Sequence, residues 1–460
     1  MEIPVESIAT RRPRQVGKAL PSVRRQVAVG QPTRSSRLVA LLIFLLAMPF
    51  YFYVGSTRLS PYRLVLVATL IPCLVAWLSG SVGRIRLQDI LMFLAATWGA
   101  AILLGQHGID EGLQSAGIFV IETFGPFLFA RRYIRDVFAF RHMVRCLVLL
   151  IAVLLPFALY ENFTGTPILI ELFGKFLPVY PIGEYEPRLG LSRAQGPFEH
   201  QILFGVVCSS AFALSFLAFG VPARMGRLGS GVVAMTVFSS LSSGAFLSVA
   251  VQVMLIVWDK VTASVRRRWA ILASIVIGTF LIVNVFSNRT PFEVFISYLT
   301  FDADTSYMRV LIWRFGTESV MMHPIFGTGL YRWERPDWMP GSIDNYWLVV
   351  AVRYGIPGFV LMAAAYLSVC FGLGRLRNLP CQVAQCRKAL IITLCGLAIA
   401  MCTVHVWDAP YVLVMFLLGS GMWIFDYSNR IPLARRKTLT RVNSLIPTCE
   451  DVCFPADRPA

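Results

Sequence analysis

Apolar runs separated by short polar segments recur along almost the whole chain, and the runs do not alternate in polarity. Runs of about 20 apolar residues are long enough to cross a bilayer core as a helix. Backbone groups in lipid must be satisfied internally, and strands of a membrane barrel would alternate, so the runs predict helices. We expect an all-α fold, a polytopic transmembrane helical bundle of about 12 spans with a large, partly helical periplasmic loop.

Two long polar loops divide the expected spans. Residues 38–287 hold spans one to nine, interrupted at about 161–199 by the first loop. The large second loop covers 288–343, residues 344–427 hold spans ten to twelve, and tails cover 1–37 and 428–460. The expected spans are 38–54, 64–78, 87–104, 113–130, 143–160, 200–219, 228–241, 244–258, 269–286, 345–373, 389–404 and 411–427.

Charge is scarce and unevenly placed. Hydrophobic residues make up 56% of the chain and charged residues 15%, against about 25% charged residues in soluble domains. The net charge of +17 resides in both tails and in every second loop between spans. This pattern follows the positive-inside rule, which predicts both termini in the cytoplasm and both long loops on the opposite side of the membrane. It accounts for the charge without a nucleic-acid partner, so membrane lipid is the expected surface partner.

The loop ends beside the membrane carry residues suited to phosphate and sugar chemistry. The first long loop ends with Arg193 and Glu199, and the second carries Arg309, Arg314 and Asp344. A planar guanidinium group binds two phosphate oxygens at once and stays charged. A carboxylate can deprotonate an attacking hydroxyl. The arginines also have an ordinary explanation, because loop arginines are commonly solvated. Aromatic residues near them have one too, because interfacial aromatic residues form belts in membrane proteins.

Glycine and proline mark two further features of the second loop. His323-Pro324 with Gly327 and Gly329 predicts a helix end and turn, which favours a structural role for His323. Gly355-Ile-Pro-Gly358 predicts a helix break, and a broken helix at the membrane face can line a polar cavity. The chain shows no phosphate-binding loop, dinucleotide fingerprint or zinc-ligand spacing, so we expect no cofactor and no metal.

Four motifs, in this order, resemble the O-antigen ligase and polysaccharide polymerase superfamily of bacterial membrane proteins. They are Arg193-x2-Gly196-Pro-Phe-Glu-His200-x4-Gly205, Ser306-x2-Arg309-x3-Trp313, His323-Pro-x2-Gly-x-Gly329 and Asp344-Asn-Tyr-x-Leu348-x6-Gly355-Ile-Pro-Gly358. The resemblance spans roughly Arg188 to Gly374. It implies a metal-independent periplasmic transfer of a glycan from an undecaprenyl-pyrophosphate carrier to an acceptor hydroxyl.

The resemblance also implies roles for individual residues. The two family arginines that hold the pyrophosphate map onto Arg193 and Arg309, and Arg314 is a third candidate of the same loop. The ligase branch has a histidine as its proposed base where this chain has Asp344, with Gly355 at the same spacing. Asp344 is therefore the first candidate base, and Glu199 is the second.

The aspartate favours the polymerase branch over ligation to lipid A-core. The expected function is a polysaccharide polymerase acting on lipid-linked repeat units, with an exopolysaccharide or O-antigen as product. A ligase with another acceptor, and a lipid-linked oligosaccharide transporter without enzymatic activity, remain as alternatives. A chain-length regulator and export machinery are candidate partners. A transporter would place its charges at mid-membrane, whereas these spans are poor in charge apart from Glu122.

Overall fold

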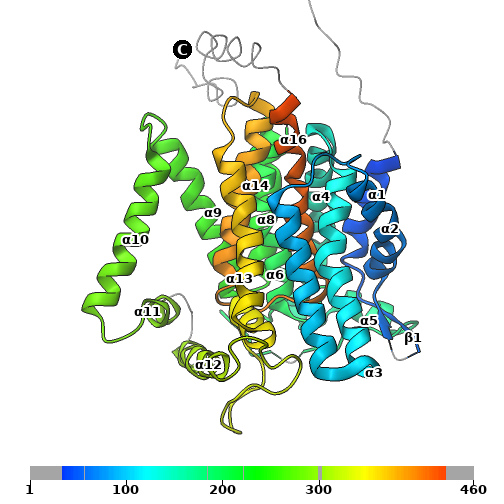
Figure 1. Ribbon diagram of the computed structural model, residues 1–460, viewed down its shortest axis with the longest axis vertical. Coiled ribbons are helices and arrows are strands. Elements are labelled where there is room, and N and C mark those ends of the chain that lie inside the picture. Colours follow the sequence, from blue (N-terminus) through cyan, green and yellow to red (C-terminus); the bar gives the residue numbers. More distant parts are fainter. Residues whose placement is uncertain (1–33, 56, 184, 221, 299–302, 431–460) are drawn as a thin grey trace, which may run out of the picture.

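A computed structural model describes residues 34–430 except 56, 184, 221 and 299–302 (Figure 1). The predictions for the two tails therefore lie almost wholly outside the described residues. The helices before the first long loop are α1 (Arg34–Leu45), α2 (Pro61–Leu78), α3 (Leu87–Tyr133) and α4 (Val137–Thr164). The others are α5 (Ile168–Gly174), α6 (Gln201–Ser209), α7 (Phe212–Ala218), α8 (Ala223–Ser239), α9 (Ser243–Val261), α10 (Arg268–Phe286), α11 (Pro291–Tyr298), α12 (Ala303–Met322), α13 (Tyr346–Arg375), α14 (Cys381–Ala400), α15 (Asp408–Ser420) and α16 (Met422–Arg430).

The all-α prediction is confirmed. The strands named in the described ranges are β1 (Phe52–Val54) and β2 (Thr57–Leu59), which form one short antiparallel hairpin. Nine segments of the described chain are long and apolar enough to cross a membrane, against about 12 expected spans. Two expected spans lie in α3 alone, and two others correspond to the shorter helices α1 and α8.

Helix α3 is a helical hairpin that turns at Gly108, whose φ of 70° and ψ of −176° are not helical. Gly99 and Gly112 let its two arms touch. A Cβ at Gly99 would lie 2.2 Å from the Phe119 ring, and a Cβ at Gly112 would lie 2.6 Å from the Leu103 carbonyl oxygen. The polar loop expected between spans three and four is thus reduced to a single turn.

The first expected span is wrong beyond Leu45. Pro49 cannot donate a helical hydrogen bond and disfavours a helical conformation at the preceding residue. The chain leaves the helix here, and the backbone N–H of Tyr51 donates to the Pro178 carbonyl at 3.1 Å. The Tyr180 N–H donates back to the Pro49 carbonyl at 3.1 Å. These bonds tie the segment before β1 to the first long loop.

Both long loops lie at one end of the bundle, which we call the loop end, and the described chain begins and ends at the opposite, tail end (Figure 1). Helix α15 is almost fully buried, whereas α10 has no buried residue and stands apart from the bundle. A helix that is apolar on all sides and is not covered by other parts of the protein is stable in lipid. The molecule is a multi-pass membrane protein with its long loops gathered at one face.

The loop after α12 is fixed against a break in α13, as the glycine pattern predicted. Gly355 interrupts α13 with a φ of 72°. Beside this break, the Thr328 N–H donates to the Val352 carbonyl at 2.8 Å and the Ile356 N–H donates to the Pro324 carbonyl at 2.7 Å. These contacts place residues 323–345 over the loop end of the bundle.

The tip of the α3 hairpin supports the same loop from the other side. The Gln106 side-chain amide donates to the Gly327 carbonyl at 2.9 Å, and His107 Nε2 accepts from the Leu330 N–H at 2.8 Å. The Tyr331 hydroxyl donates to the Gln106 carbonyl at 3.0 Å. Hydrogen bonds from two membrane-spanning elements, α13 and α3, therefore hold the loop in place.

Replacing Gly355 with alanine should destabilise the protein more than replacing Gly80. Both glycines have a left-handed φ, which costs an L-residue about 1–2 kcal/mol, but a Cβ at Gly80 meets nothing within 4 Å. At Gly355 it would lie 2.1 Å from the Ile325 carbonyl oxygen. Thermal unfolding of the detergent-solubilised protein should give a clearly lower midpoint for Gly355→Ala. Equal midpoints for the two variants would contradict the tight contact.

Candidate active site

Three arginines from the two long loops interact electrostatically at the loop end. Arg309 on α12 is buried, and Arg188 and Arg193 in the first long loop are half-buried. Burial lowers the pKa of Arg193 to about 10, with further repulsion from Arg188 and Arg309. Burial and Arg188 also lower the pKa of Arg309, while Asp344 opposes the shift. The fold therefore holds positive charges close together in a poorly hydrated site. This arrangement costs folding free energy unless a bound anion compensates the charge.

Arg309 and Arg193 both have buried nitrogen donors that are not used. Arg309 Nε and one terminal nitrogen, and Arg193 Nε, are buried without a hydrogen-bond partner in the described part of the chain. An unmade bond to a buried charged donor costs more than an ordinary hydrogen bond contributes. Donors of this kind fit a ligand that brings several acceptor oxygens, such as a phosphate.

The end of α4 positions Arg193. The Glu161 carboxylate accepts from the backbone N–H groups of Gln195 at 2.8 Å and Gly196 at 3.0 Å. On the other side of Arg193, the Asn162 side-chain amide donates to the Ser192 carbonyl at 2.6 Å. Both α4 residues are buried. The loop on either side of Arg193 is thus fastened to a membrane span.

Asp344 lies just before α13. Its neighbour Asn345 caps that helix, accepting from the Leu348 N–H at 3.1 Å. Burial raises the pKa of Asp344, and the positive charge of Arg309 opposes the rise. A carboxyl group with a raised pKa is a better proton acceptor when ionised than an ordinary aspartate, so Asp344 suits the role of general base.

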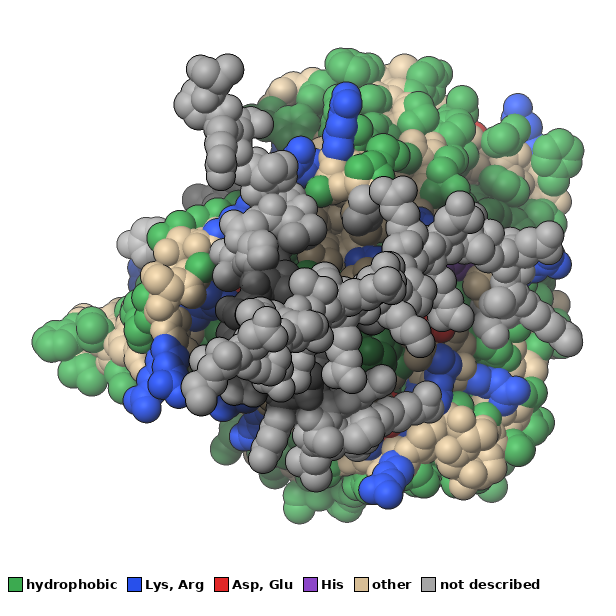
Figure 2. Space-filling model, turned by 90° about the horizontal axis from the view of Figure 1, so that it is seen from above, with side chains coloured by type: hydrophobic (Ala, Val, Ile, Leu, Met, Phe, Trp, Pro, Cys, Tyr) green, Lys and Arg blue, Asp and Glu red, His purple; other side chains and the backbone are tan. Residues whose placement is uncertain are grey.

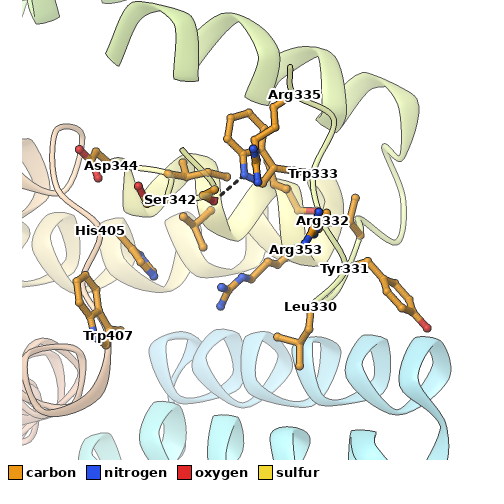
Figure 3. Close-up of a pocket in the computed structure, with 15 residues that line it drawn as sticks. Leu330, Tyr331, Arg332, Trp333, Arg335, Ser342, Asp344, Arg353, His405 and Trp407 are labelled. Atoms are coloured by element: carbon orange, nitrogen blue, oxygen red, sulfur yellow. Dashed lines mark hydrogen bonds between the residues drawn. The ribbon is translucent and has the colours of Figure 1, made fainter. Parts of the chain in front are cut away.

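Asp344 and Arg309 lie between two larger hollows. Both line a small cleft together with Asn345 and Leu348. On one side, Asn345 and Leu348 also line an apolar groove of about 630 Å³ between α12, α13 and α14. On the other side, Asp344 also lines a polar cavity of about 380 Å³, which Figure 3 shows in close-up. The apolar groove and the polar cavity are therefore each linked to the cleft at Arg309 and Asp344 through shared lining residues.

Glu199 lies beside the polar cavity. Its carboxylate accepts from Trp407 Nε1 at 2.8 Å and lies 3.9 Å from Arg58. Arg58 also pairs with Asp408 at 2.5 Å. Trp407 lines the cavity, so Glu199 is engaged in holding the cavity wall.

The structure does not bring Arg314 to the cluster. Arg314 follows Arg309 by five residues on α12, which turns it to another side of the helix. Its side chain is 61% exposed and pairs with Glu293 at 2.6 Å. The helix end and turn expected at His323 are present, because α12 ends at Met322 and the His323 carbonyl accepts from the Gly327 N–H at 3.0 Å.

The structure adds residues that sequence reasoning left without a role. His200 Nδ1 accepts from the Ile202 N–H at 3.1 Å, and burial together with Arg193 lowers the pKa of His200 to about 4. His200 is therefore neutral at physiological pH and keeps Nε2–H as a donor next to the arginines. His405 and Trp407 come from the turn between α14 and α15, and Arg353 comes from α13. Arg188, His200 and Arg353 lie within or beside quoted motifs, but no sequence pattern marks His405 and Trp407.

Charge within the membrane spans is internally paired. Arg63 of α2 pairs with Glu122 of α3 at 2.7 Å and with Asp408 at 2.7 Å, and the Tyr62 hydroxyl donates to Glu122 at 2.8 Å. Glu122 therefore has a structural explanation. Within the described ranges, no group of three or more His, Cys, Asp or Glu side chains is placed to hold a metal ion.

Residues 228–363 match the model of a family described as O-antigen ligase. The matched stretch runs from α8 into α13 and contains Arg309, Asp344 and the break at Gly355. This match confirms the resemblance to the O-antigen ligase and polymerase superfamily, whose members are membrane enzymes acting on lipid-linked glycans. None of the curated proteins matches the chain.

Proposed function

We propose that this membrane protein is a polysaccharide polymerase. It transfers a glycan from an undecaprenyl-pyrophosphate carrier to a hydroxyl of another lipid-linked repeat unit, at the periplasmic face of the bacterial inner membrane. The observation that carries the proposal is the position of Arg309 and Asp344 between an apolar groove and a polar cavity. The donor has the same three parts in the same order: isoprenoid chain, pyrophosphate and sugar.

The groove suits the isoprenoid part. Its lining includes Phe292, Trp313, Phe359 and Leu367, and the small cleft at Arg309 shares Phe292 and Trp313 with it. Burial of each methylene group away from water contributes about 0.8 kcal/mol. A carrier chain lying in this groove would bring its pyrophosphate to the unpartnered donors of Arg309, with Arg193 nearby.

The reaction in this proposal breaks the bond between the anomeric carbon and the phosphate oxygen. The acceptor hydroxyl oxygen forms the new bond to the anomeric carbon, and its proton passes to Asp344. The pyrophosphate leaves on its lipid with one more negative charge, which Arg193 and Arg309 stabilise without a metal ion. A preorganised donor at such a position is worth about 3 kcal/mol in the transition state. Asp344 is preferred over Glu199 as base because Glu199 already binds Trp407.

The orientation in the membrane rests on the basic loops. They lie at the tail end of the bundle, which the positive-inside rule places in the cytoplasm, together with both termini. The loop end, with both long loops, then faces the periplasm. On this topology we also propose the domain boundaries expected from the sequence.

A ligase with a different acceptor is the second candidate, favoured by the description of the matched family. The chemistry would be the same, and Asp344 in place of the ligase-branch histidine argues against a lipid A-core acceptor. A transporter is less well supported, because Arg63 and Glu122, two buried charges of the spans, neutralise each other.

A deletion strain tests the proposal through the size profile of its lipid-linked and surface glycans. Single repeat units should accumulate on the carrier at the periplasmic face, polymer should disappear, and the wild-type gene should restore it. Long polymer that stays on the carrier would show a ligase instead. Units confined to the cytoplasmic face would show a transporter, and an unchanged profile would contradict all three functions.

A further inference from the structure

The polar cavity carries more positive charge than the proposed chemistry uses. Arg332, Arg335 and Arg353 line it, and Asp344 is the one carboxylate among the lining residues. Three positive charges against one negative leave an excess of two. No ion pair with a described carboxylate is seen for any of the three arginines in the ranges that the structure covers.

The three arginines differ in how tightly they are held. Arg335 donates to the Met339 carbonyl, and the neighbouring Trp333 Nε1 donates to the Gly341 carbonyl at 2.9 Å. Arg335 is thus part of the loop framework. Figure 3 shows Arg353 extending along the cavity toward His405, with Arg332 on the same side of the loop. Arg332 and Arg353 are therefore the two charges available to a ligand.

The remaining walls suit a saccharide. Trp333 and Trp407 line the cavity, and flat aromatic side chains pack against sugar rings. Burial, together with repulsion from Arg353, lowers the pKa of His405 to about 3. His405 is therefore neutral and adds hydrogen bonding without charge. The walls combine aromatic faces, a neutral imidazole and the guanidinium groups of Arg332 and Arg353.

The cavity lies on the acceptor side of the proposed reaction. It meets the cleft at Asp344, and the apolar groove meets the same cleft at Asn345 and Leu348. With the lipid in the groove and the pyrophosphate at Arg309, a nucleophile in direct displacement approaches from the side away from the leaving group. That side is the polar cavity, and the base Asp344 borders it.

We infer that the cavity binds the acceptor glycan and that this glycan is acidic, carrying a carboxylate or phosphate substituent that pairs with Arg332 and Arg353. The inference rests on the proposed function, since the cavity is assigned to the acceptor by its position relative to the donor site. Arginine favours such groups because its planar donors match two acceptor oxygens at once. A neutral saccharide would bring no negative charge to offset these two positive charges.

Analysis of the glycan provides the first test. The polymer that disappears in the deletion strain should contain a uronic acid, a carboxyl-bearing substituent or a phosphate in each repeat. A neutral polymer would overturn the inference and leave the proposed function intact. An unchanged polymer in the deletion strain would instead reject the proposed function, so the two failures are distinguishable.

Binding to the purified protein in lipid nanodiscs provides the second test, read by tryptophan fluorescence. The probes are trigalacturonic acid, its carboxyl-reduced counterpart galactotriose, and undecaprenyl pyrophosphate. The acidic trisaccharide should bind about tenfold more tightly than the neutral one, as expected for charge-assisted contacts, and the preference should shrink in salt. The double variant Arg332→Gln/Arg353→Gln should abolish the preference, and Arg289→Gln, at an exposed loop position, should retain it.

The lipid probe distinguishes the acceptor from the donor. Undecaprenyl pyrophosphate should bind the double variant as well as it binds the wild type, because its anion lies at Arg309. Equal weakening of the lipid and the acidic trisaccharide would assign the cavity arginines to the donor pyrophosphate and overturn the inference. Equal affinity of the wild type for the two trisaccharides would overturn it as well.

Discussion

Replacement of Arg309 by alanine should reduce glycan transfer by about 10²- to 10³-fold, the range found when one preorganised donor to a developing negative charge is removed. Arg309 is 6% exposed, and two of its nitrogens have no hydrogen-bond partner among the described residues. Its donors are therefore free for the leaving pyrophosphate. Arg309→Lys should recover part of the activity, because lysine restores the charge but not the paired donors.

The same helix offers a matched control. Arg314→Ala removes an arginine of α12 that is exposed and paired with Glu293, so polymer yield should stay close to that of the wild type. Membrane levels of each variant are measured by immunoblot, and polymer is measured by its size profile in the complemented deletion strain. Loss of polymer in Arg314→Ala at normal protein levels would show that α12 presents a different face to the substrate. Normal polymer in Arg309→Ala would remove the pyrophosphate site from this position.

Replacement of Asp344 by asparagine should reduce transfer by about 10²- to 10⁴-fold, the usual contribution of a positioned general base. Burial raises the pKa of Asp344, and the base works only when it is ionised. Activity of the wild type should therefore fall as the pH drops through this raised pKa, at a higher pH than an ordinary aspartate would require. Above that pH the carboxylate is ionised and the rate should reach a plateau.

The pH profile separates Asp344 from Glu199. The residual activity of Asp344→Asn should lose the acidic limb of the profile, whereas an acidic limb that persists in this variant would identify another titrating base. Asp344→His introduces the residue of the ligase branch, with an ordinary pKa of about 6.5. It should retain more activity than asparagine and keep a pH-dependent limb. The measurement is the initial rate with purified protein, lipid-linked donor and acceptor across a pH series.

The sequence predicted most of the fold because hydrophobic length is a strong signal in membrane proteins. Helices α2, α4, α9 and α10 lie close to expected spans, and both long loops gather at one end. The hairpin β1–β2 could not be predicted in this way. The residues of β1 are apolar enough to continue a span, and the proline that ends α1 acts together with backbone partners from a loop more than 100 residues away.

The candidate site was predictable only as far as the motifs extend. Arg193, Arg309 and Asp344 are brought together by three separate segments, and the motifs identified each of them. The sequence around Arg314 is similar in composition to the sequence around Arg309. The two residues differ because they point to different sides of α12. His405 and Trp407 come from a turn with no motif, because their role depends on which helix ends meet in space.

The apolar groove has a kinetic consequence for the proposed reaction. Met321, which lines the groove, is 71% exposed, so the groove is open at the surface of the protein, and we expect lipid tails to enter it from the leaflet without passing through water. For a substrate confined in this way, the quantity that governs encounter is its mole fraction in the leaflet. Adding inert phospholipid at constant amounts of protein and carrier would then slow the reaction by surface dilution. The bulk concentrations of protein and carrier stay the same in this experiment.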